Sequence, residues 1–164
     1  MKKTFKLALT GIFSAFALIS FIIENSFPPL ILPGAKMGVS NLFILLTAII
    51  LGGRYAVTVL IVKTVLGSLF VGNISAVMYS LPAGAVALCV ELILIYIVKS
   101  VSILATSIVG AVLNVTIQNA VFCLVTKVPE YLFYLPYLAL LSVVSGALIG
   151  IVTYLIIKKF PSYS

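Results

Sequence analysis

The chain has 164 residues, of which 63% are hydrophobic and 8% are charged, whereas a soluble domain carries about a quarter charged residues. With a mean hydropathy of +1.37, this composition leaves too little polar surface for a water-soluble protein and predicts an integral membrane protein. The formal charge of +7 is then a topology signal rather than a nucleic-acid footprint, because cytoplasmic loops of membrane proteins are enriched in Lys and Arg.

The first segment is a basic N-terminus followed by an apolar run from Leu7 to Ile23. The run is longer than the apolar core of a secretory signal, and no small-residue cleavage pattern follows it. We therefore predict a transmembrane helix over residues 5–24. Gly11 and Ala15 lie four residues apart on this helix, a spacing that lets two helix backbones approach closely. Either packing inside the protein or docking of a partner would explain that pair.

The second segment is irregular. Asn25, Ser26 and the prolines that follow them break any helix, and only Val39 to Leu51 is continuously apolar. That length gives about 20 Å of helix, which is short for a membrane span. Whether residues 39–52 cross the membrane decides the topology.

Four later apolar runs are long enough to span, over residues 54–72, 76–98, 102–126 and 133–157. If residues 39–52 also cross, most basic residues fall on the side of the two termini, namely Lys2, Lys3, Lys6, Arg54, Lys99, Lys158 and Lys159. Without that crossing, the two basic termini would lie on opposite faces. We therefore predict an all-α bundle of six transmembrane helices, in one domain over residues 1–164, with both termini cytoplasmic.

The non-cytoplasmic loop before the short segment contains Gly34, Lys36 and Gly38. Its glycines allow close backbone approach, Ser40 or Asn41 could cap the helix, and the helix start offers free N–H groups to an anion. We therefore predict that Lys36 and Asn41 contribute to a ligand site. An ordinary capped loop with an exposed lysine is the alternative.

Two charged residues lie inside predicted spans. Lys63 is near the middle of its span, where a charge costs about 2.5–3.5 kcal/mol, and Glu91 is the only acid deep in any span. Intramembrane charges usually pair and face the interior of the bundle. We predict that Lys63 and Glu91 form such a pair at the ligand site, with a purely structural ion pair as the alternative.

Three amides lie in the fifth predicted span: Asn114, Gln118 and Asn119. Asn114 and Gln118 are four residues apart and share one face, so their amides converge on a cavity or on a neighbouring helix. We predict that all three belong to the ligand site, although hydrogen bonding between helices would also explain them. In the last span, Ser142, Gly146 and Gly150 form a second small-residue stripe, for which internal packing and a partner interface both stay open.

The chain resembles a known family. The resemblance is carried by the run from Pro33 to Asn41, by Leu51-Gly52-Gly53-Arg54, by Lys63 and Gly67, and by the Gln118-Asn119 pair. These match the Gx transporter family, also called heptaprenyl diphosphate synthase component I. Members of that family are similar in size and helix pattern to the substrate-binding S components of energy-coupling factor (ECF) transporters.

The resemblance implies a vitamin-type binding protein of six helices, with an outward-facing site, that joins a transmembrane scaffold subunit and two ATPases in a bacterial plasma membrane. S components dock on the scaffold through an Ala-x-x-x-Ala motif on the first helix. Gly11 and Ala15 are the closest match, since Ala8 is followed four residues later by Ile12.

The older family name implies an alternative, a membrane component that assists prenyl diphosphate synthesis. Such a synthase needs clustered Asp residues to hold magnesium, and this sequence contains no Asp. It has no His, and Cys89 and Cys123 have no neighbouring ligand type, so we expect no metal and no catalysis by this chain. It also lacks a phosphate-binding Gly-x-x-x-x-Gly-Lys-Ser/Thr loop, so a transport subunit would take its energy from a partner.

The two lysines and the residues around them predict the chemical character of the ligand. Lys36 and Lys63 favour a carboxylate or phosphate, and the Phe- and Tyr-containing surroundings suit a ring or an isoprenoid body. A flavin, a quinone precursor and a lipidic diphosphate all meet that description. We expect no resident cofactor, and a small anionic micronutrient or cofactor precursor as cargo.

Overall fold

The computed structural model describes residues 3–26, 38–98 and 100–159, and these residues form helices and turns without any strand. The α-helices are α1 (Lys3–Ser26), α2 (Val39–Ile50), α3 (Gly53–Phe70), α4 (Ala76–Ile93), α5 (Ile103–Thr126) and α6 (Leu135–Lys159). A π-helical turn, η1 (Leu94–Val98), continues α4, and a 3-10 helix, η2 (Pro129–Tyr134), precedes α6. Each segment that the sequence predicts to be helical is helical, with ends shifted by a few residues.

Within the described residues, five helical segments are long and apolar enough to cross a membrane. They are α1, α3, α4 with η1, α5, and η2 with α6, whereas α2 has only 12 residues. The protein is therefore an all-helical, multi-pass membrane protein by length and composition of its helices. The short α2 is the segment on which the crossing count depends.

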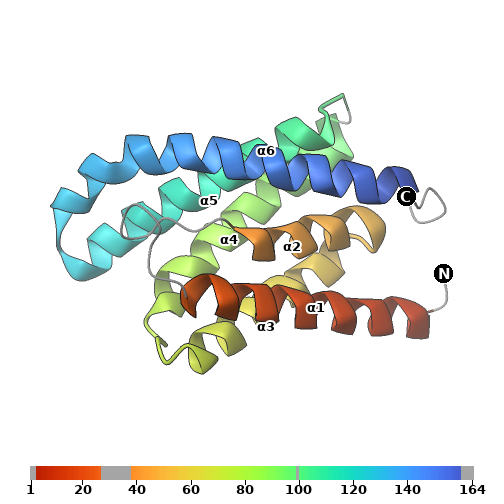
Figure 1. Ribbon diagram of the computed structural model, residues 1–164, viewed down its shortest axis with the longest axis horizontal. Helices are drawn as coiled ribbons and strands as arrows, with labels where there is room; N and C mark the ends of the chain where they lie inside the picture. Colours follow the sequence, from red (N-terminus) through yellow and green to blue (C-terminus); the bar gives the residue numbers. More distant parts are fainter. Residues whose placement is uncertain (1–2, 27–37, 99, 160–164) are drawn as a thin grey trace.

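Successive helices run in opposite directions, so the start of α1 and the end of α6 lie at the same end of the molecule (Figure 1). The start of α3 lies there too, since Lys6 Nζ lies 5.9 Å from the centre of the Tyr55 ring. Lys158 and Lys159 occupy the last turn of α6. We call this end, which carries Lys6, Arg54, Lys158 and Lys159, the basic end.

Close helix contacts are made where side chains are small. A Cβ atom on Gly67 of α3 would overlap the Phe21 ring of α1, and one on Gly146 of α6 would come within 2.9 Å of the Ile108 Cα of α5. Ser107 Oγ also donates a hydrogen bond to the Gly146 carbonyl at 2.8 Å. The small-residue stripe of α6 therefore packs inside the protein against α5, and this answers one of the questions left open by the sequence.

Helix α2 is capped at both ends by other helices. Its N-cap is Gly38, with φ 69° and no side-chain cap, and the Val39 N–H donates to Glu24 Oε1 of α1. At the other end, Tyr96 Oη of η1 donates to the Ala48 carbonyl at 2.7 Å. The prediction that Ser40 or Asn41 caps this helix is wrong, because α2 begins at Val39 and places both residues inside the first turn.

Candidate functional site

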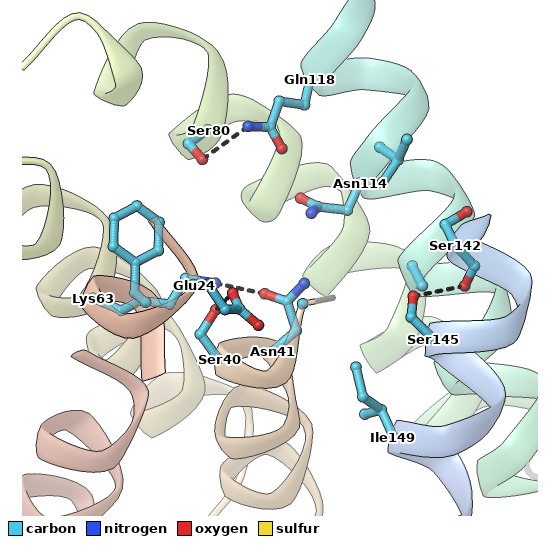
Figure 2. Close-up of a pocket in the computed structure, with 14 residues that line it drawn as sticks. Glu24, Ser40, Asn41, Lys63, Ser80, Asn114, Gln118, Ser142, Ser145 and Ile149 are labelled. Atoms are coloured by element: carbon cyan, nitrogen blue, oxygen red, sulfur yellow. Dashed lines mark hydrogen bonds between the residues drawn. The ribbon is translucent and has the colours of Figure 1, made fainter. Parts of the chain in front are cut away.

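All six α-helices line one pocket (Figure 2). Nine of its lining side chains are polar: Glu24, Ser40, Asn41, Lys63, Ser80, Asn114, Gln118, Ser142 and Ser145. Water centres can occupy about 40 Å³ of it, which is room for a few waters or one small ring rather than for a long ligand. Polar groups are costly in an apolar bundle, so nine around one space mark this as the candidate site.

The pocket lies in the half of the bundle away from the basic end. Glu24 is near the end of α1, Asn41 is in the first turn of α2, and Ser80 is in the second turn of α4. These three positions are all remote from the basic end, because α1 starts there and α2 and α4 end there (Figure 1). If the basic end faces the cytoplasm, the pocket belongs to the outer half of the membrane.

The buried ammonium of Lys63 is held by α2. Its side chain is 6% exposed, and Nζ donates to Asn41 Oδ1 at 2.5 Å and lies 6.0 Å from the centre of the Phe21 ring. A charge-assisted hydrogen bond and a cation–π contact together offset part of the cost of burying the charge. Two predicted site residues, Lys63 and Asn41, therefore meet in the pocket.

Glu24 is the main residue that the sequence analysis missed. Its carboxylate accepts hydrogen bonds from the Val39 N–H and, at 3.5 Å, from Ser40 Oγ. The first N–H of α2, which the sequence analysis offers to an anionic ligand, is thus taken by the protein's own carboxylate. One signal was available, since Glu24 is one of three acids in the chain and ends an apolar segment.

Glu91 lies outside the pocket. Its side chain is 9% exposed, and it contacts α5 so closely that a Cβ atom on Gly110 would clash with Oε1. The lining of the pocket includes Lys63 without Glu91. An interior Lys63–Glu91 pair stays a prediction, and the pocket itself does not depend on it.

The three amides of α5 separate into two groups. Asn114 and Gln118 line the pocket, and Gln118 Nε2 donates to Ser80 Oγ of α4 at 3.4 Å. Asn119 turns away, because its Nδ2 donates to the Tyr131 carbonyl of η2 at 3.4 Å and its Oδ1 accepts from Cys123 Sγ at 3.3 Å. Asn119 therefore fastens η2 to α5 and does not line the pocket.

The model of the family described as heptaprenyl diphosphate synthase component I matches residues 13–156, the greater part of the chain. The chain belongs to the heptaprenyl diphosphate synthase component I family. No curated protein and no solved structure matches it. The matched range includes the lining residues of the pocket that the structure describes, from Phe21 to Ile149.

The remaining predicted residues are Lys36, Gly11 and Ala15. Lys36 falls outside the described residues. Gly11 and Ala15 are exposed on the outer face of α1, and a Cβ atom on Gly11 would meet nothing within 4 Å. The described residues include no group of three His, Cys, Asp or Glu side chains placed to hold a metal ion.

Proposed function

We propose that this chain is the membrane-embedded substrate-binding subunit of an ECF-type uptake transporter, and that its cargo is a small micronutrient or cofactor precursor. The observation that carries the proposal is the polar pocket to which all six helices contribute. Binding sites for small molecules in membrane transporters lie between helices, where polar groups converge on an otherwise apolar interior.

The proposed topology has six crossings in one domain, both termini in the cytoplasm, and the pocket in the outer half of the membrane. Two observations support it: the alternating helix directions (Figure 1) and the gathering of Lys6, Arg54, Lys158 and Lys159 at one end. Positive charge is retained on the cytoplasmic side. A pocket remote from that side suits uptake from outside.

The proposed docking face for the scaffold is the outer side of α1. Gly11 and Ala15 are exposed, and the open space around Gly11 favours a partner surface over internal packing. In lipid, helices associate by close backbone contact at small residues. The proposed partners are a transmembrane scaffold and ATPase subunits, which would supply the energy for uptake.

The described lining of the pocket does not require the cargo to be an anion. Of the two lysines that favour an anion, only Lys63 lies among the described residues, and it already donates to Asn41. Glu24 adds a carboxylate to the same pocket. The charge of the ligand is therefore a separate question.

The family description itself favours a second candidate, a non-catalytic membrane subunit of a heptaprenyl diphosphate synthase. In that role, catalysis would reside in a partner chain rich in Asp. The size of the pocket argues against it, because a prenyl chain is much longer than one small ring.

Affinity purification of the tagged full chain from its native membrane separates the two candidates. Transport predicts that an ATPase and a transmembrane scaffold co-purify, and that native mass spectrometry detects a retained small molecule. Ala15→Leu is the matched control, since it should lose both partners. Co-purification of a soluble, Asp-rich synthase in their place would support the second candidate.

A further inference from the structure

Asn114 presents to the pocket an amide group that is available to bind a ligand. Its side chain points into the space between Asn41 and Gln118 (Figure 2), and within the described residues it makes no hydrogen bond. The other polar lining groups differ in this respect. Lys63 donates to Asn41, Gln118 donates to Ser80, and the Ser142 and Ser145 hydroxyls donate to backbone carbonyls. A primary amide offers donors and an acceptor side by side, so Asn114 can receive a ligand on both.

The described lining of the pocket contains one acidic and one basic side chain. Glu24 and Lys63 are the two ionisable residues in its described lining, and their formal charges cancel. An anionic ligand would meet the Glu24 carboxylate, and a cationic ligand would meet the Lys63 ammonium. Such unfavourable pairings are strong away from water, so they select against either ion.

The group that complements a primary amide is another amide held in the cis form by a ring. Its N–H donates to Asn114 Oδ1 while its carbonyl accepts from Nδ2, which gives two parallel hydrogen bonds in one plane, as when Asn reads the edge of adenine. Lactams, imides and cyclic ureas carry this edge. Val115 and Ile149 in the lining supply apolar surface for the faces of the ring.

The size of the pocket agrees with one ring. It has room for a few water molecules, which one small ring could replace. We infer that the pocket binds an uncharged cyclic amide, of the lactam, imide or cyclic urea class, through the side chain of Asn114. This inference rests on the proposed substrate-binding function and adds the chemical class of the cargo.

The test uses the purified full chain in detergent and three uncharged ring amides as probes: 2-pyrrolidinone (a lactam), uracil (an imide) and 2-imidazolidinone (a cyclic urea). Each is compared with the counterpart in which every ring nitrogen is methylated, so that no donating N–H is left, and with inorganic pyrophosphate as the anionic probe. Affinity is measured by calorimetric titration. At least one parent ring amide should bind saturably, and N-methylation should weaken its binding by about tenfold or more.

Two variants test the role of Asn114. Asn114→Leu should weaken binding of that ring amide by about tenfold or more, whereas Asn119→Leu, which removes an amide from the same helix outside the pocket, should leave its affinity unchanged. The comparison of methylated and parent probes on the unaltered chain stands even if Asn114→Leu fails to fold.

Three outcomes would overturn the inference: none of the parent ring amides binds, the N-methylated probes bind as well as their parents, or the affinity survives Asn114→Leu. Binding of pyrophosphate in place of the ring amides would also overturn it, while leaving the transport role intact. The transport role fails separately, if neither scaffold nor ATPase co-purifies with the chain.

Discussion

Lys63 Nζ and Asn41 Oδ1 lie 2.5 Å apart, and this hydrogen bond joins the interior of α3 to the first turn of α2. It gives the buried ammonium a neutral hydrogen-bond partner. The position of α2 beside α3 is therefore linked to a charge that the membrane would otherwise disfavour.

Replacing Asn41 by Leu should lower stability by about 1–3 kcal/mol, because it removes one acceptor of a buried ammonium. The double replacement Lys63→Met with Asn41→Leu should recover much of that loss. Thermal unfolding in detergent measures both. The parallel cycle with Lys63→Met and Glu91→Leu tests the interior pair, and additive losses there would show that those two residues are not partners.

Replacing Glu24 by Ala should destabilise the start of α2, because the Val39 N–H loses its carboxylate acceptor. The expected cost is about 0.5–2 kcal/mol, as for the loss of a helix N-cap. Hydrogen exchange should then be faster in the first turn of α2 than in α5, which serves as the internal reference. Unchanged protection at Val39 and Ser40 would contradict this capping role.

Two glycine substitutions should have opposite effects. Gly146→Ala should destabilise the protein by about 1–3 kcal/mol, because its Cβ would meet the backbone of α5. Gly11→Leu should leave the melting temperature and ligand binding nearly unchanged but abolish assembly with the scaffold, because its side chain would enter open space on the docking face. A destabilised, non-binding Gly11→Leu protein would rule out the docking role.

Cysteine labelling in membrane vesicles tests the topology. In a background without Cys89 and Cys123, single cysteines at Ser100 and Ser162 should react only from the cytoplasm. Cysteines at Ser75 and Lys127 should react from outside. Labelling of position 162 from outside would mean that α2 does not cross.

The helical segments and the polar residues of the interior could be predicted from the sequence. The length of an apolar run and the presence of a charged or polar residue within it are local signals. Lys63, Asn41, Asn114 and Gln118 do line one pocket. What could not be predicted is which polar residue faces which. Lys63 has Asn41 as a hydrogen-bond partner, and Glu91 is packed beside Gly110, because rotation of each helix about its axis depends on packing across the whole bundle.

Glu24 is a second residue whose contact could not be predicted from the sequence. Its position at the end of an apolar segment suggests a residue in the headgroup region, yet its carboxylate folds back onto the start of α2. Glu24 and Val39 are 15 residues apart, and no periodic pattern in the sequence records that contact. Ser80 and Ser145 were missed, and Ser142 was noted only as part of a small-residue stripe, because an isolated hydroxyl in a membrane helix most often bonds to its own backbone.

The capping of α2 by Glu24 and Tyr96 bears on how the protein responds to membrane thickness. A spanning helix normally tilts or stretches its surroundings so that its ends reach the headgroups. Both ends of α2 instead find partners on α1 and η1, so this helix of about 18 Å has no need to reach either surface. Its depth is set by its neighbours, and the part of the pocket that it forms should keep its shape in thin and thick bilayers alike.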